Sequence, residues 1–93
     1  MHLRQCRREI DNIDSELLRL LNTRVRLVVD IAERKRQRGT GIRDPQRERE
    51  VLERLTKINK GPTDYRAINA IFRRIIGESR RIAIASAQDK PKR

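Results

Sequence analysis

The chain is poor in aromatic residues and in cysteine. Its 93 residues include one phenylalanine, one tyrosine, one cysteine and no tryptophan. A single cysteine excludes an internal disulfide and is typical of a reducing compartment. No run approaches the ~18 apolar residues of a membrane span, and the first residues lack the apolar stretch of a signal peptide. We therefore expect a cytoplasmic protein without a membrane partner.

Apolar residues in general are also scarce. They make up 35% of the chain, whereas charged residues make up 40%. A single domain of this size and composition has a thin core, so self-association is expected. The formal net charge of +11 is spread along the chain, which suits anionic partners in general and does not single out nucleic acid.

Glycine and proline are absent from residues 3–38, and this stretch predicts one long helix. Its apolar residues recur at alternating steps of three and four, which is the pattern of one helical face: Leu3, Cys6, Ile10, Ile13, Leu17, Leu20, Leu27 and Ile31. We call this face the seam. Gly39 and Gly41 signal the end of the helix, which would be about 50 Å long at 1.5 Å per residue.

Two shorter helices are predicted beyond the glycines. Asp44–Pro45 offers an N-cap followed by proline at the first helical position, and residues 59–63 end that helix. The third begins near Thr63 or Asp64. No alternating strand pattern occurs. We predict an all-α domain of three helices over residues 1–85, followed by a polar, basic and disordered tail over residues 86–93.

The lengths of the helices predict a dimer. Two helices of about 25–30 Å cannot cover one of about 50 Å. An uncovered seam would leave a large apolar stripe, which soluble monomers avoid. A second copy that packs along the first helix covers it. The alternative is a bent first helix that folds back to form a monomeric bundle.

Arg24 and Lys35 lie on the apolar seam. A buried charge is costly unless an opposite charge meets it. The two residues are about 16 Å apart along the axis, so their side chains could converge on one small anion. Alternatively, each extends to solvent or pairs with an acid of a neighbouring helix. A nucleic-acid binder would instead gather its cations on a solvent face.

Three further polar residues flank the predicted apolar faces. Arg47 and Glu48 border the buried side of the second helix in its first turn, where they could bind a carboxylate and a hydroxyl. The alternative is a local ion pair between Asp44 and Arg47. Ser79 interrupts the apolar stripe of the third helix, and such a serine usually donates to the carbonyl four residues back.

Nothing in the sequence indicates a nucleophile, a metal site or a cofactor. Cys6 has no neighbouring histidine except His2 at the chain end, and its position on the seam favours an apolar packing role. There is no glycine-rich phosphate loop and no general base with an obvious partner. An enzyme of this sequence would work without covalent or metal catalysis, so we predict no metal and no cofactor.

The chain resembles the all-helical (AroQ) class of chorismate mutases over nearly its full predicted helical length. The order and spacing of five fragments carry the resemblance: Arg7 to Asp14, Leu17 to Leu21 with Arg24, Ile31 to Lys35, Asp44 to Glu48, and Ile71 to Arg80. The resemblance implies an interlocked homodimer of three-helix chains whose long first helices pair. It also implies two active sites, each of which takes one arginine from the other subunit.

The resemblance also implies roles for individual residues. The arginine from the other subunit corresponds to Arg7, and Lys35, Arg24 and Arg47 correspond to the catalytic cations that contact the carboxylates and the ether oxygen of chorismate. Contacts to the ring hydroxyl correspond to Glu48 and to the backbone near Asp44. Ser79 corresponds to a polar contact from the third helix.

The implied reaction is the intramolecular rearrangement of chorismate to prephenate, in aromatic amino-acid biosynthesis. Ala83 departs from the family, which places Gln or Glu there to hydrogen-bond the ether oxygen. Losing one such donor can cost about 10²–10³ in rate, so reduced activity is one prediction. The alternatives are an isochorismate pyruvate lyase-like enzyme and a catalytically weak chorismate- or prephenate-binding regulatory domain of a larger enzyme.

Overall fold

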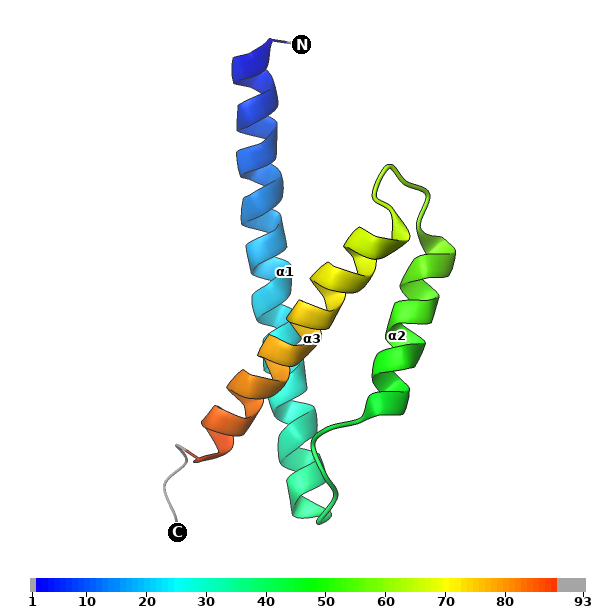
Figure 1. The fold of residues 1–93 in the computed structure, drawn as a ribbon. Helices are drawn as coiled ribbons and strands as arrows, with labels where there is room; N and C mark the ends of the chain where they lie inside the picture. The colour runs from blue at the N-terminus through cyan, green and yellow to red at the C-terminus, as the bar shows by residue number, and fades with distance from the viewer. Residues whose placement is uncertain (1, 89–93) are drawn as a thin grey trace.

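The computed structural model describes residues 2–88, which form three α-helices (Figure 1). They are α1 (Leu3–Gln37), α2 (Pro45–Ile58) and α3 (Tyr65–Gln88). No strand occurs within the described residues. The all-α prediction and the order of one long helix and two shorter ones are confirmed.

The helix ends follow the local sequence signals. Asp44 is the N-cap of α2, and its carboxylate accepts a hydrogen bond from the backbone N–H of Arg47 at 3.1 Å. Asp64 precedes α3 and accepts in the same way from the N–H of Ala67 at 2.8 Å. Gly39, just after α1, has a φ of 75°, a backbone conformation that side chains with a Cβ rarely adopt. The predicted starts and stops are confirmed.

The C-terminal boundary of the domain needs correction. The sequence predicts disorder from Ser86, but α3 continues to Gln88. The guanidinium of Arg36 on α1 donates to the carbonyl of Ala87 at 3.2 Å, which ties the last turn of α3 to α1. Ala87, within this stretch, also favours helix. The remainder of the predicted tail, residues 89–93, lies outside the described residues.

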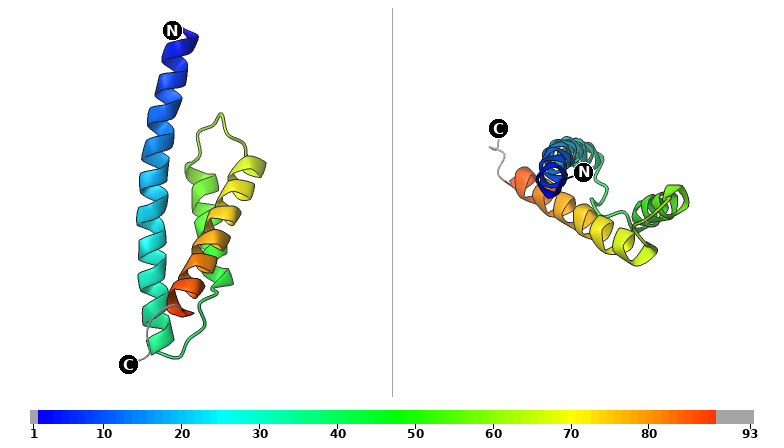
Figure 2. Two further views of the ribbon diagram at one scale, coloured as in Figure 1. Left: turned by 90° about the vertical axis from the view of Figure 1, so that its left-hand side faces the viewer. Right: turned by 90° about the horizontal axis from the view of Figure 1, so that it is seen from above.

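The three helices form an open trough. α3 crosses the C-terminal half of α1, and α2 runs beside α3 (Figure 1). Seen from above, α1 and α2 both lie on the same side of α3, so that α3 is the floor and the other two helices are the walls (Figure 2). The N-terminal half of α1 extends beyond both neighbours. The fold therefore brings all three helices together only around the C-terminal half of α1.

The core within one chain is very small. Only Ala32 on α1 and Ser79 and Ala83 on α3 are buried among the residues whose burial is described. All three side chains are small, which allows α1 and α3 to approach closely where they cross. Most of the seam is open instead: Ile13 is 57% exposed and Leu17 is 51% exposed.

The alternative of a bent first helix is wrong. α1 is one uninterrupted helix of 35 residues, which corresponds to about 52 Å at 1.5 Å per residue. The longest dimension of the chain is 57 Å. Nothing within the described residues folds back to cover the N-terminal part of the seam.

Candidate active site

A cavity of about 320 Å³ lies in the trough where all three helices meet. Its lining is apolar at the seam and on the facing sides of α2 and α3, with charged groups at intervals. The lining residues come from α1, from the connection between α1 and α2, and from α2 and α3: Arg24, Leu27, Val28, Ile31, Lys35, Ile42, Asp44, Arg47, Glu48, Val51, Ile76 and Arg80. We call this cavity the trough pocket.

Lys35 and Asp44 meet at one end of the trough pocket. The Lys35 Nζ lies 3.4 Å from the Asp44 Oδ2, and the Lys35 side chain is 29% exposed. The backbone N–H of Arg47, followed by the Lys35 ammonium, holds the pKa of Asp44 below its ordinary value of 3.8. Asp44 therefore stays ionised at neutral pH, starts α2 and directs the Lys35 ammonium toward the pocket.

The Arg24 side chain extends from α1 to α3, the floor of the trough. Its Nη1 lies 3.3 Å from the Ser79 Oγ, and the Ser79 hydroxyl itself donates to the carbonyl of Ile75 at 2.7 Å. The local alternative for Ser79 is thus confirmed, and its remaining acceptor capacity serves Arg24. Burial and repulsion by Arg47 lower the pKa of Arg24. No carboxylate is hydrogen-bonded or ion-paired to Arg24 in the described part of the chain, so its charge is open to an anionic ligand.

Arg47 and Glu48, in the first turn of α2, contribute charges of opposite sign. The Arg47 guanidinium lies 3.6 Å from Glu50 on the outer side of the helix, and its side chain is 66% exposed. Asp44 pairs with Lys35 and accepts from the Arg47 backbone, so the predicted local ion pair between Asp44 and Arg47 is not what stabilises the start of α2. Glu48 points to α3, where it accepts a hydrogen bond from Arg80.

The trough pocket brings together five of the eight residues that the sequence predicts for the site: Arg24, Lys35, Asp44, Arg47 and Glu48. Ser79 contacts one of them. Ala83 is buried and does not line the pocket. Arg7 lies on the exposed N-terminal half of α1, about 42 Å along the helix from Lys35, so it cannot reach this pocket within the same chain.

Arg80 also lines the pocket and is not among the site residues predicted from the sequence. It follows Phe72 and Ile76 at steps of four, so it is a cation on an apolar stripe. This is the same anomaly that identifies Arg24 and Lys35 on the first helix. Applied to the third helix, it would have selected Arg80.

Comparison with known proteins identifies this arrangement of helices. The model of the family described as "Chorismate mutase type II" matches residues 6–84. The chain belongs to the chorismate mutase type II family. A chorismate mutase of Thermus thermophilus has a similar structure, with a TM-score of 0.85, 36% identity, and coverage of 87% of this chain and 92% of that one. The chorismate mutase of Helicobacter pylori in complex with prephenate gives a TM-score of 0.88 at 27% identity, covering 96% of this chain and 97% of that one.

Longer relatives contain a region similar to this chorismate mutase domain. The bifunctional chorismate mutase/prephenate dehydratase of Aquifex aeolicus is 42% identical over 78 residues, which are 80% of this chain and 22% of that protein. Further bifunctional relatives of the same description, from Neisseria gonorrhoeae and Buchnera aphidicola, are each covered over 19% of their length. The chain thus spans about a fifth of the length of these curated relatives.

The charges of the trough pocket suit the chemistry of this family. Four cations and two carboxylates line it, and each carboxylate is already paired with one cation. The cavity thus carries a net positive charge in an otherwise apolar surface, where a dianion is attracted more strongly than in water. Within the described residues, no group of His, Cys, Asp and Glu is arranged to hold a metal ion.

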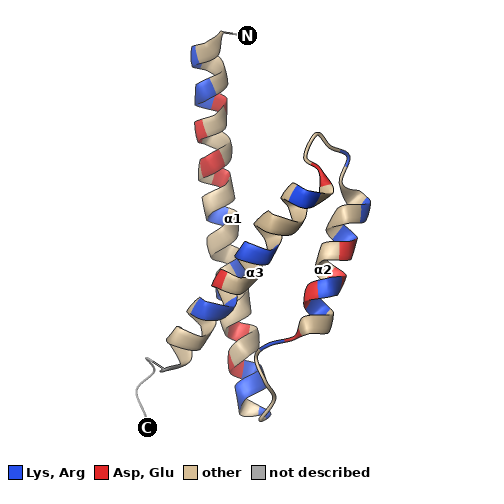
Figure 3. Ribbon diagram, viewed as in Figure 1, with Lys and Arg blue, Asp and Glu red and all other residues tan. Residues whose placement is uncertain are grey.

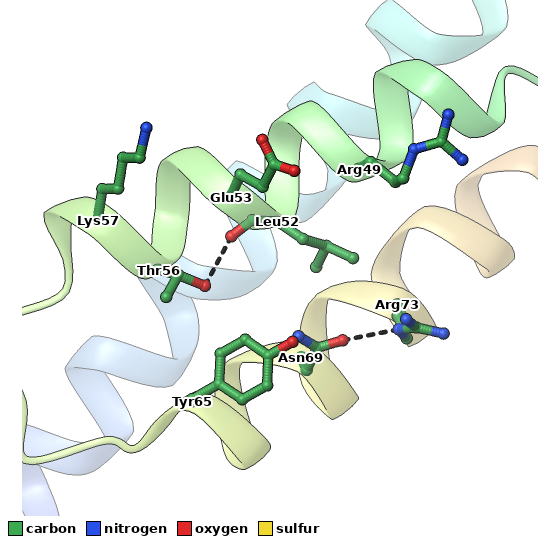
Figure 4. A pocket seen from close by; sticks show the side chains of 8 residues that line it. All are labelled: Arg49, Leu52, Glu53, Thr56, Lys57, Tyr65, Asn69 and Arg73. Carbon is green, nitrogen blue, oxygen red and sulfur yellow. Dashed lines mark hydrogen bonds between the residues drawn. The ribbon is translucent and has the colours of Figure 1, made fainter.

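A second cavity of about 330 Å³ lies between α2 and α3, as Figure 4 shows. Its lining includes three cations and one tyrosine: Arg49, Leu52, Glu53, Thr56, Lys57, Tyr65, Asn69 and Arg73. Arg73 donates to Asn69 at 2.7 Å within α3, and Tyr65 is 63% exposed. None of the predicted site residues lies there, so the trough pocket is the candidate active site of this family member.

Lysine and arginine residues are distributed over all three helices (Figure 3). The predicted cue for a nucleic-acid binder was a gathering of cations on a solvent face. In the described chain, Arg24, Lys35 and Arg80 instead line the same pocket. Among residues 2–88, no helix combines the length and the apolar character that crossing a membrane requires.

Proposed function

We propose that the chain catalyses the rearrangement of chorismate to prephenate in the trough pocket. The observation that carries the proposal is the convergence of Arg24, Lys35 and Arg47 on one largely apolar cavity in a member of the chorismate mutase type II family. Chorismate is a small dianion, so its size and charge fit a cavity of about 320 Å³ lined by cations.

The reaction needs little chemistry from the protein. One C–O bond breaks as one C–C bond forms within the same molecule, and no proton, electron or second reactant is required. A site accelerates such a step by holding the flexible substrate in its compact reactive conformer. It also accelerates the step by placing fixed positive charge beside the ether oxygen, where negative charge develops. The proposal thus needs neither a general base nor a cofactor.

Each pocket cation has a role in this proposal. Arg24, which is held in place by Ser79, clamps one carboxylate, and Arg47 clamps the other after its guanidinium turns inward from Glu50. Lys35 stabilises the ether oxygen after the substrate draws its ammonium away from Asp44. The Glu48 carboxylate accepts a hydrogen bond from the ring hydroxyl of chorismate. Because Ala83 offers no donor, Lys35 performs the electrostatic step without the partner that the family usually supplies.

We also propose that the active form is a homodimer in which Arg7 completes the site of the partner subunit. Each seam residue that is fully buried would contribute about 1.5–3 kcal/mol. An antiparallel pair of α1 helices that places Arg7 beside residues 27–31 has its two-fold axis near residues 17–19, because the axis lies midway between residues that face each other. Leu17, which is 51% exposed, would then lie beside its own copy.

The first test is direct turnover by the purified chain. Loss of chorismate absorbance with formation of prephenate is expected, and the Lys35→Ala variant should lose most of it. Pyruvate released from isochorismate, without prephenate from chorismate, would instead identify a lyase. Calorimetric binding of prephenate without any turnover would identify a regulatory domain.

The second test is complementation between two inactive variants. Arg7→Ala and Lys35→Ala chains are co-expressed with different tags, and the mixed dimers contain one site with both residues intact and one site with neither. Random mixing should restore about a quarter of the parent activity, because half of the dimers are mixed and each has one working site. No recovery, with mixed dimers present, would remove Arg7 from the partner's site.

A further inference from the structure

Arg80 occupies an unusual position among the arginines of α3. Arg74 and Arg81 pair with Glu78 within the helix, with side chains that are 82% and 68% exposed. Arg73 donates to Asn69, also within α3. Arg80 alone among these four reaches another helix, where it pairs with Glu48 of α2, and its side chain is 29% exposed.

Glu48 is equally enclosed, with 28% of its side chain exposed. Both residues line the trough pocket, so their contact forms part of the pocket wall. A carboxylate in such a place needs a fixed partner, because a charge that loses water must be compensated. A guanidinium supplies directed donors on one side and leaves the other lone pairs of the carboxylate free.

We propose that Arg80 is a positioning residue that fixes the Glu48 carboxylate in the orientation that accepts the ring hydroxyl of the substrate. This inference rests on the proposed function and goes beyond it, because it assigns Arg80 a role through Glu48. Arg80 also links the first turn of α2 to α3 along the wall of the pocket. It thereby couples the position of an acceptor on one wall to the helix that forms the floor.

The inference predicts a particular pattern of kinetics. The hydroxyl contact exists in the bound substrate as well as in the transition state, so its loss raises KM more than it lowers kcat. Arg80→Ala should lower kcat/KM about tenfold, mainly through KM, since Glu48 loses a partner in a partly enclosed site. Arg80→Lys, which keeps the charge, should recover part of the loss. Arg81→Ala removes a neighbouring arginine outside the pocket and should leave kcat/KM within about twofold of the parent.

The deciding experiment is a double-mutant cycle between Arg80→Ala and Glu48→Gln, read as kcat/KM on chorismate. If Arg80 acts through Glu48, the double variant should be about tenfold below the parent, the same as each single variant. If Arg80 contacts the substrate itself, the losses should multiply to about a hundredfold, which would overturn the inference. Far-ultraviolet circular dichroism and sedimentation confirm that each variant keeps its helices and its association state.

The same cycle separates this inference from the proposed function. A parent chain that converts chorismate while the two variants behave additively retains the mutase function and loses the role of Arg80. A parent chain with no turnover overturns both. Prephenate binding, measured by calorimetry on the four proteins, should show the same coupling in Kd. This second readout keeps the test decisive when the double variant is too slow for kinetics.

Discussion

The two halves of α1 differ sharply in what surrounds them. From residue 7 to residue 20 every residue is exposed, although Ile10, Ile13 and Leu17 are among them. Beyond residue 20 the helix is crossed by α3, and Arg24 and Lys35 line the trough pocket. Within residues 2–88, one half therefore offers an apolar surface without a neighbour, and the other lines a charged cavity together with α2 and α3.

The two halves of α1 therefore have different roles in folding and in binding. The C-terminal half carries the crossing with its small buried residues and supplies the pocket. The N-terminal half adds no contact to this fold within residues 2–88, and its apolar residues suit the proposed second copy of the chain. On this interpretation both halves are needed. The C-terminal half carries most of the site, and the N-terminal half forms the dimer interface and supplies Arg7 to the partner subunit.

The largest effect is expected from breaking the exposed half. Leu17→Glu should abolish the dimer and lower activity by more than about a hundredfold, because two carboxylates would face each other near the two-fold axis. Sedimentation at micromolar concentration and chorismate turnover measure the two effects. Ser15→Glu adds the same charge about 160° around the helix and should change neither. A dimeric, active Leu17→Glu variant would contradict the division between the halves.

A second prediction breaks the pocket and leaves the exposed half intact. Lys35→Ala should lower kcat by about 10²–10³, since it removes the charge that stabilises the ether oxygen. Its dimer should persist in sedimentation. Arg34→Ala is the matched control, because the Arg34 side chain is 72% exposed and pairs with Asp30 on the helix surface. Equal losses in both variants would show that the position of Lys35 in the pocket has no special consequence.

A third prediction concerns the crossing under the pocket. Ala83→Gln extends a side chain from the buried crossing toward the trough pocket and should raise kcat up to about tenfold by supplying a hydrogen-bond donor there. It should also lower the melting temperature, because a longer side chain enters a position that is 2% exposed. Ala85→Gln, at an exposed position two residues on, should alter neither value. An unchanged kcat with a lowered melting temperature would mean that the position serves packing alone.

The smallest effect is expected for the contribution of Asp44 to thermal stability at low pH. The pKa of Asp44 is lowered in the fold, so its contribution to stability is complete above its ordinary pKa of 3.8 and is lost as the pH falls below that value through the folded pKa. Asp44→Asn keeps an N-cap and removes the titration. Thermal melting between pH 6 and pH 2.5 should therefore fall less steeply for this variant than for the parent. Parallel curves would remove Asp44 from the acid response.

Much of the fold could be predicted because each helix begins and ends at residues that act on the neighbouring backbone. Gly39, Asp44, Pro45 and Asp64 act within a few residues of themselves, and the helix ends follow them. The last turn of α3 could not be predicted in this way. It is held by Arg36, which is 51 residues away in sequence, and no local pattern reveals that contact.

The candidate site was predictable to the extent that its residues violate a pattern. Arg24 and Lys35 break the apolar seam, and both line the pocket. Arg80 breaks the stripe of α3, and its partner Glu48 lies 32 residues earlier, so its role required the packing of two helices. Ala83 could be read as a lost donor, but its burial at the crossing became evident only in three dimensions.

The uninterrupted length of α1 restricts how a chain of this kind can change. One inserted residue between Arg7 and Arg24 would turn the preceding part of the helix by about 100° and shift it by about 1.5 Å. In the proposed dimer, Arg7 would then no longer face the partner's pocket, although no side chain had been altered. We therefore expect changes of length to be tolerated in the connection at residues 59–63, which lines no part of the trough pocket, whereas α1 can accept exchanges of residues but not a change in their number.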